Sequence, residues 1–168
     1  MTVTLSSAGG SSVPNWALLA SNAPTGVSTY TFSGLAGYSR YRIFAPNLVP
    51  SGAGGLQLRI NADSGANYNW GFFGFSASTV TGNQTSLATF YTADSTPTTT
   101  AFSRQFDIEN ALLLTPKFIT STSTGYSGSV YVVNGFGSYI TTSAITSITL
   151  LMSANNFSTG TIYLLGAN

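Results

Sequence analysis

Short runs of β-branched and aromatic residues recur along the whole chain, and turn-forming residues separate them at intervals of about 10–15 residues. Several runs alternate with a period of two. Tyr41 and Ile43 alternate with Arg40 and Arg42, which is typical of a strand with one buried and one solvated face. Almost no segment has apolar residues at helical spacing. The pattern predicts an all-β, antiparallel β-sandwich of the jelly-roll kind, in one domain over residues 1–168.

The expected strands share this composition and end at Gly, Pro, Asn or Ser. They are 2–6, 13–20, 26–33, 39–48, 55–62, 68–76, 86–92, 102–109, 117–122, 128–134, 145–152 and 159–165. Three other segments read as connections: a turn at 51–55, an exposed loop at 95–100, and a single turn or loop at 110–114 before Pro116.

Charge is scarce. Only 5% of the residues are charged, whereas an average soluble domain has about 25%. Hydroxyl and amide groups must therefore supply solubility, and such a surface repels its own copies weakly. One interpretation is a surface that other proteins partly cover; the alternative is a protein that uses few charges without such a purpose.

The charge pattern also bears on partners. The net charge is +1 and the basic residues are scattered, so no basic stripe for nucleic acid is present. No apolar run approaches the about 18–20 residues of a membrane-spanning helix. The start, Met1-Thr2-Val3-Thr4, lacks the basic and apolar regions of a signal peptide, so we expect no export by that route.

The chain has no histidine and no cysteine, which excludes Ser-His-Asp and Cys-His catalysis, thiol chemistry and the usual zinc sites. Asp107 and Glu109 are two residues apart in an expected strand and would share one face. Two carboxylates are the minimum for glycoside hydrolysis. The favoured interpretation is a solvated strand face with Arg104 or Lys117 nearby. We therefore expect a non-enzymatic protein with no catalytic residue and no cofactor.

The segment Asn61-Ala62-Asp63-Ser64-Gly65 places oxygen atoms at alternate positions before a glycine, like the opening of a calcium loop. The further carboxylates that such a loop needs do not follow. The favoured interpretation is an Asx-type turn between two strands, with no metal bound, and a metal site is the alternative.

The densest aromatic run begins at Tyr68 and ends at Phe75. Alternation places Tyr68, Trp70 and Phe72 on one face, and Phe73 and Phe75 on the other. A run this apolar favours core on one face and a subunit interface on the other. Because flat rings stand beside amide and charged groups, a platform for glycans is the alternative.

The terminal strand, with contact residues expected over 157–165, also carries apolar groups on both faces. The candidate residues for an interface or glycan platform are Tyr68, Trp70, Phe72, Phe157 and Tyr163. Trp16, by contrast, is expected in the core.

Three stretches carry a resemblance that spans nearly the whole chain. They are Phe32-Ser33-Gly34-Leu35-Ala36-Gly37-Tyr38-Ser39-Arg40-Tyr41-Arg42-Ile43; Asn47-Leu48-Val49-Pro50 with Leu56-Gln57-Leu58-Arg59-Ile60-Asn61-Ala62-Asp63-Ser64-Gly65-Ala66-Asn67-Tyr68; and Ile145-Thr146-Ser147-Ile148-Thr149-Leu150 with Asn156-Phe157-Ser158-Thr159-Gly160-Thr161-Ile162-Tyr163-Leu164-Leu165-Gly166. In this order they resemble a diffuse family of virion structural proteins of tailed bacteriophages. The family more often has Thr-Asp-Gly-Gly where this chain has Ala62-Asp63-Ser64-Gly65.

The resemblance implies a β-sandwich located in the virion and assembled in the host cytoplasm. It implies other virion proteins as partners, the major capsid protein or tail components, and a homotrimer as the oligomer. One expected role is a capsid decoration (cement) protein that stabilises the shell. The other is a receptor-binding module of a tail or fibre that recognises a glycan on the host surface. The chain has no heptad stalk and no fibre-like repeat, which favours decoration.

Overall fold

The structure is a computed structural model that describes residues 15–75, 83–91, 99–126 and 130–168. These residues form antiparallel strands and turns, and they contain no helix that could cross a membrane. The strands are β1 (Ala17–Asn22), β2 (Thr29–Ser33), β3 (Arg40–Pro50), β4 (Leu56–Ile60), β5 (Tyr68–Phe75), β6 (Asn83–Leu87), β7 (Phe90–Tyr91), β8 (Phe102–Glu109), β9 (Lys117–Tyr126), β10 (Val130–Tyr139), β11 (Ser147–Met152), β12 (Phe157–Thr159) and β13 (Ile162–Ala167).

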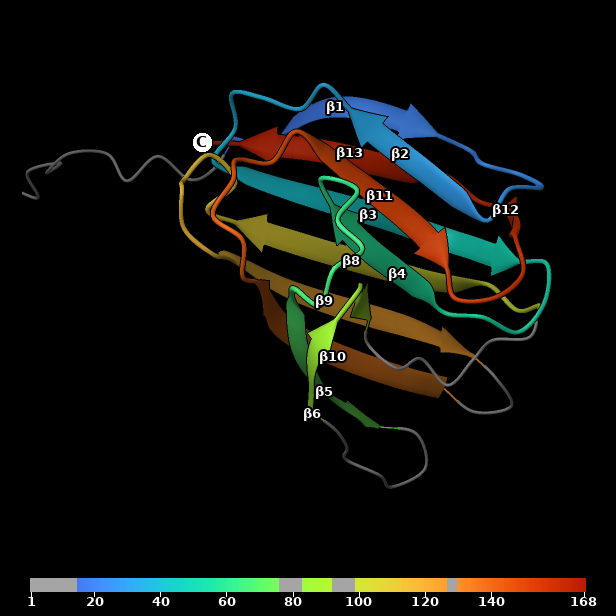
Figure 1. The fold of residues 1–168 in the computed structure, drawn as a ribbon. Coiled ribbons are helices and arrows are strands. Elements are labelled where there is room, and N and C mark those ends of the chain that lie inside the picture. The colour runs from blue at the N-terminus through green and yellow to red at the C-terminus, as the bar shows by residue number, and fades with distance from the viewer. Residues whose placement is uncertain (1–14, 76–82, 92–98, 127–129) are drawn as a thin grey trace, which may run out of the picture.

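Two sheets pack against each other, with the smaller sheet lying across one side of the larger (Figure 1). The larger sheet has nine strands in the order β1-β13-β3-β8-β9-β10-β5-β6, and β12 pairs with β3 beside this path. The smaller sheet has four strands in the order β2-β11-β4-β7. The all-β, antiparallel architecture predicted from the sequence is confirmed, and the jelly-roll connectivity stays a prediction.

Most expected strands are observed within a few residues of their predicted bounds. The segment 86–92 differs, because it divides into β6 and β7, which belong to different sheets. The segment 128–134 extends to Tyr139, since β10 runs in continuous register along both β9 and β5. The segment 2–6 and most of the expected loop 95–100 lie outside the described residues. The segment 110–114 forms the expected turn, in which the Leu113 N–H donates to the Asn110 carbonyl at 3.1 Å.

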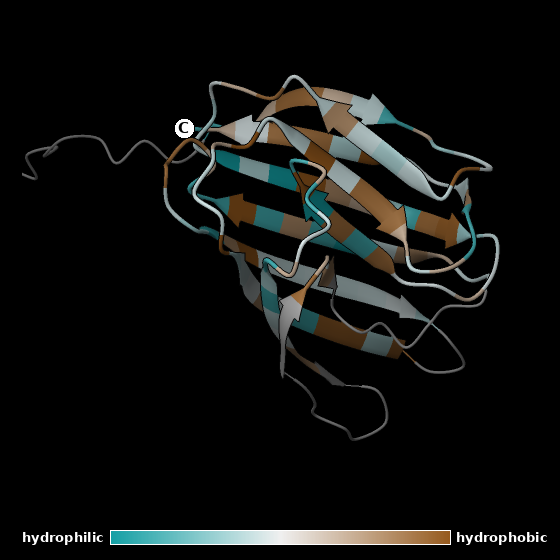
Figure 2. Ribbon diagram, in the orientation of Figure 1, coloured by the Kyte–Doolittle hydropathy of each residue, from teal (hydrophilic) through white to brown (hydrophobic). Residues whose placement is uncertain are grey.

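Alternation of polarity decides which side of each strand is buried. In β8 the buried side chains are Phe102, Arg104, Phe106 and Ile108, and those between them are partly exposed. Strand β9 alternates in the same way over its first eight residues. The bands of colour along the strands in Figure 2 follow this period of two. One side of the larger sheet therefore faces the smaller sheet, and the other faces solvent.

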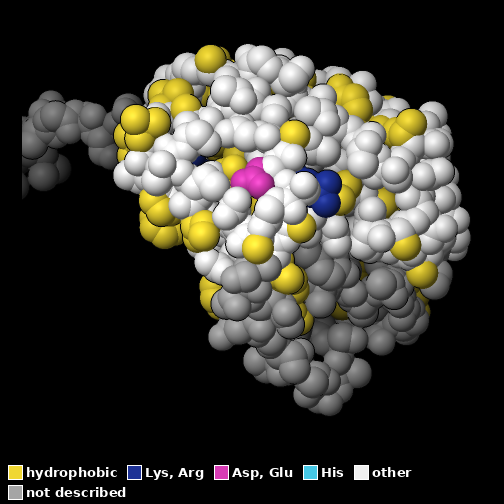
Figure 3. Space-filling model, in the orientation of Figure 1, with side chains coloured by type: hydrophobic (Ala, Val, Ile, Leu, Met, Phe, Trp, Pro, Cys, Tyr) yellow, Lys and Arg dark blue, Asp and Glu magenta, His cyan; other side chains and the backbone are white. Residues whose placement is uncertain are grey.

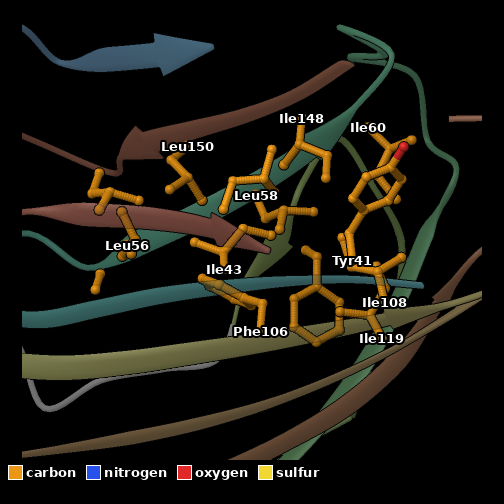
Figure 4. Packing of buried hydrophobic residues seen from close by; sticks show 14 of the residues in the cluster. Tyr41, Ile43, Leu56, Leu58, Ile60, Phe106, Ile108, Ile119, Ile148 and Leu150 are labelled. Atoms are coloured by element: carbon orange, nitrogen blue, oxygen red, sulfur yellow. The ribbon is translucent and has the colours of Figure 1, made fainter. Parts of the chain in front are cut away.

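The core lies between the sheets and draws residues from both (Figure 4). The larger sheet contributes Tyr41, Ile43, Phe106, Ile108 and Ile119, and the smaller sheet contributes Leu56, Leu58, Ile60, Ile148 and Leu150. All ten are at most 1% exposed, so close packing of their side chains holds the sheets together, and the sequence has no cysteine for a disulfide.

Three buried tyrosines predict that the protein loses stability in alkali. Burial raises the pKa of Tyr41, Tyr68 and Tyr139 above the ordinary value of 10.0. Above about pH 10 the unfolded chain loses these protons while the folded chain keeps them, so the free energy of unfolding falls by up to about 1.4 kcal/mol per group and pH unit. We expect the urea midpoint to be lower at about pH 11 than at about pH 9.

Lys117 has the opposite effect on the pH dependence of stability. Burial lowers its pKa from 10.5, so the unfolded chain binds more protons and the free energy of unfolding rises with pH. Three tyrosines outweigh one lysine. In Tyr68→Phe the decline with pH should be shallower than in the wild type. A midpoint that rises over this range would contradict the prediction.

Candidate functional site

The carboxylate pair lies on the solvent side of β8, and each member forms an ion pair. Arg42 Nε contacts Asp107 Oδ1 at 2.6 Å, and Arg40 Nε contacts Glu109 Oε2 at 2.7 Å. The second oxygen of Asp107 accepts a hydrogen bond from the Gln105 amide at 2.7 Å. The shared face expected for Asp107 and Glu109 is therefore observed, and it forms a ladder of opposite charges with β3.

The prediction that Arg104 or Lys117 lies beside this carboxylate pair is wrong. Arg104 is 1% exposed and Lys117 is 0% exposed, and both point into the protein. Arg104 Nη1 donates to the Leu56 carbonyl at 3.2 Å, and its guanidinium lies 5.3 Å from the ring of Phe106. The carboxylates of β8 pair instead with arginines of β3, because adjacent strands in register place their side chains opposite each other. The spacing of residues along one strand does not reveal which strand will lie beside it.

Both carboxylate oxygens of Asp63 accept hydrogen bonds, from Gly65 and Asn67 nearby in the chain and from Tyr139 on β10. Its Oδ1 accepts the Gly65 N–H at 2.7 Å, and its Oδ2 accepts the Asn67 amide at 2.8 Å and the Tyr139 hydroxyl at 2.9 Å. The Gly65 N–H, followed by the Asn67 and Tyr139 donors, holds the pKa of Asp63 below its usual value. This is the Asx-type turn that the sequence favoured. The described residues contain no cluster of three or more potential metal-ligating side chains.

Asn61 fastens the same turn to the segment before β11. Its backbone is in the left-handed region with φ of 55°, and its Oδ1 accepts the N–H groups of Thr146 and Ser147 at 2.7 and 3.2 Å. Its amide donates to the Ala144 carbonyl at 2.8 Å. The loop 61–65 therefore serves as a structural clamp.

The aromatic candidates separate onto two sides of the larger sheet. Tyr68 and Phe157 are 0% exposed and Trp70 is 8% exposed, so no ring face of these three is available as a glycan platform. Phe72 is partly buried against the core. Tyr163, on β13, is also partly buried but faces the solvent side, beside Phe44.

Trp16 was expected in the core and is instead partly exposed, with Arg42 4.5 Å from its ring. A cation over an indole face is favourable by about 0.5–1 kcal/mol at an exposed site. The sequence does not indicate this contact, because Trp16 and Arg42 are brought together by the pairing of β1 and β3 with opposite edges of β13.

The solvent side of the larger sheet, here called the outer face, is the most distinctive surface. Registered pairing places side chains of β3, β8, β9, β10 and β5 in rows across it. The rows are Arg40, Glu109, Phe118, Ser138 and Asn69; Arg42, Asp107, Thr120, Phe136 and Gly71; and Phe44, Gln105, Thr122, Asn134 and Phe73.

Three exposed rings form a diagonal across neighbouring strands of this face. Phe118 on β9, Phe136 on β10 and Phe73 on β5 lie in successive rows and are 58%, 50% and 44% exposed. Diagonal neighbours in adjacent strands lie about 7–8 Å apart, within reach of aromatic side chains. We call these three residues the phenylalanine stripe. The sequence reasoning missed it, because Phe118 and Phe136 are each the single phenylalanine of their strand and align with Phe73 only through the register of the sheet.

The face of the smaller sheet differs. Figure 3 shows it as mostly uncharged polar atoms and backbone, with a small acidic and a small basic patch near its middle. Thr31 on β2 and Thr149 on β11 share a hydrogen bond of 2.9 Å across this face. The exposed phenylalanines among the described residues, Phe44, Phe73, Phe118 and Phe136, lie on the outer face of the larger sheet.

The described geometry contains paired charges, a structural turn and an exposed aromatic face, and it brings no free acid and base together. Comparisons with known proteins found no family model, no curated protein and no solved structure that matches this chain.

Proposed function

We propose that this protein is a non-enzymatic structural component of a bacteriophage virion that docks onto other virion proteins through the outer face. The phenylalanine stripe is the observation that carries the proposal. The three exposed rings present apolar surface, and its burial against a partner would be favourable by roughly 25 cal/mol per Å². Such patches are typical of protein–protein contact sites.

The outer face has the dimensions of such a contact. Six strands from β13 to β5 span about 24 Å at about 4.8 Å per strand, and an eight-residue strand is about 27 Å long. The product, about 650 Å², approaches the roughly 800 Å² that each partner contributes to a standard interface. Its charges are neutralised as Arg40–Glu109 and Arg42–Asp107 pairs, which lowers the penalty of covering them.

The role that we propose is capsid decoration by a homotrimer that clamps neighbouring shell subunits. The trimer and the virion come from the family resemblance, whereas the contact surface comes from the outer face. Identical chains usually assemble with closed symmetry, since this satisfies every contact and stops growth. A virion location, assembly in the host cytoplasm and a jelly-roll connectivity belong to the same proposal.

A receptor-binding module of a tail or fibre is the second candidate, because amide side chains stand between the rings. Asn134 accepts a hydrogen bond from Thr122 at 3.0 Å, and Gln105 donates to Asp107 at 2.7 Å. One polar group of each amide is therefore already paired within the protein, which favours a protein over a glycan as the partner of the outer face.

Replacing the central ring of the stripe tests the proposal. We expect Phe136→Lys to weaken binding to virion shells that lack the protein at least about 100-fold, because a lysine would be buried without a partner at the contact. Light scattering at micromolar concentration should show a trimer of the 17.5 kDa chain for both the wild type and the variant, because the substitution lies at the shell contact.

Val27→Lys is the matched control, since it places the same charge at an exposed apolar residue beside the smaller sheet. It should bind the virion shells like the wild type. A wild-type protein that is strictly monomeric and fails to bind virion shells lacking it would refute the decoration role. If that monomer bound host glycan instead, the receptor-binding alternative would replace it.

A further inference from the structure

A pocket of about 430 Å³ opens where the two sheets end side by side. Strand β1 is an edge of the larger sheet and β2 is an edge of the smaller one (Figure 1). Leu19 and Ala20 of β1 and residues 30–33 of β2 line it, together with the segment 34–36. Its volume lies within the about 300–1,000 Å³ that is typical of small-molecule sites.

The lining is aromatic and uncharged. Tyr30, Tyr38 and Tyr41 contribute to the wall with Phe32, and none of the lining residues is acidic or basic. Two edge-to-face pairs order these rings: Tyr30 with Phe32 at 5.0 Å between centroids, and Tyr38 with Tyr41 at 6.2 Å. A charged ligand would lose its hydration here without finding an opposite charge.

The pocket also offers polar groups from the backbone. Within the described residues β2 pairs only with β11, and an edge strand leaves alternate N–H and C=O groups unpaired. The unpaired edge of β2 therefore presents donors and acceptors along the pocket wall.

We infer that this pocket binds a neutral sugar ring. The C–H face of a pyranose packs on the rings of Tyr30 and Tyr38, and its hydroxyls match the free peptide groups of β2. A purely apolar ligand would leave these polar groups unpaired. The inference does not rest on the proposed function, because none of the residues that line the pocket belongs to the phenylalanine stripe.

Calorimetric titration with the methyl glycosides of glucose, galactose and mannose, and with N-acetylglucosamine, tests the inference. We expect at least one to bind with a dissociation constant of about 1 mM or tighter. Tyr38→Ala should weaken that binding about tenfold, which corresponds to about 1.4 kcal/mol, because it removes a ring from the pocket wall. Ala36→Trp, at an exposed lining residue, should abolish it by filling the pocket.

Tyr163→Ala is the matched control, since it removes the ring of a partly buried tyrosine on the outer face and should bind sugar like the wild type. A cooperative thermal transition of Tyr38→Ala would show that its weaker binding is not a loss of fold. Three results would overturn the inference: no sugar binds the wild type, only an apolar probe such as benzyl alcohol binds, or binding survives both pocket variants.

Discussion

Replacing Lys117 by alanine is expected to lower the free energy of unfolding by about 3 kcal/mol. Lys117 is 0% exposed, and its Nζ donates to the carbonyl oxygens of Leu113 at 2.5 Å and Thr115 at 2.6 Å. Hydrogen bonds from a charged donor contribute about 1.5–3 kcal/mol each, and truncation also removes the packed side-chain stem. Urea unfolding followed by circular dichroism measures the loss.

Lys117→Met separates the two contributions, because methionine retains most of the apolar stem and removes the donor. Its loss should be smaller than that of alanine, at about 2 kcal/mol. Leu114→Ala is a control in the same turn, since Leu114 is 76% exposed and its truncation should change stability by less than about 0.5 kcal/mol. An alanine variant as stable as the wild type would show that Lys117 does not hold the turn.

Tyr68→Phe is expected to destabilise the protein by about 2 kcal/mol, whereas Tyr41→Phe is expected to be neutral or stabilising. Both tyrosines are 0% exposed. The Tyr68 hydroxyl accepts the Ile60 N–H at 2.8 Å and lies 3.3 Å from the carbonyl oxygens of Ile60 and Asp63. Removing it leaves a buried N–H without its acceptor, whereas removing the Tyr41 hydroxyl takes away an unpaired group.

The two variants make a matched pair, because each deletes one oxygen from a buried ring and creates almost no cavity. Denaturant midpoints at neutral pH, with equal slopes, give the difference directly. Equal losses in both variants would mean that the hydrogen bond of Tyr68 is not what distinguishes the two sites.

Much of the strand pattern could be predicted from the sequence because it is local. Alternation through 39–48 and 102–109 reports a half-buried strand without knowledge of its neighbours. The same period correctly put Asp107 and Glu109 on one face. The Asx-type turn at Asp63 was equally readable, since its hydrogen bond to Gly65 lies within two residues.

The candidate site was harder to predict, because β5 carries aromatic residues on both sides. Local polarity cannot choose between the face of Tyr68 and Trp70 and the face of Phe73. Tertiary packing made the choice: Tyr68 stacks on Tyr139 at 4.9 Å and its hydroxyl bonds to β4, which turns Phe73 toward solvent. The aromatic candidates named from the run were consequently mostly core residues.

The sequence by itself determined the all-β class, most strand positions and the pairing of residues on one strand face, because these follow from the period of two. Only the tertiary structure decided which strands became neighbours. That decision brought Arg40 and Arg42 to the carboxylates, directed Lys117 inward to turn carbonyls and aligned Phe118, Phe136 and Phe73 in one stripe. The physical reason is that cross-strand contacts join residues far apart in the chain, and their register depends on the whole sheet.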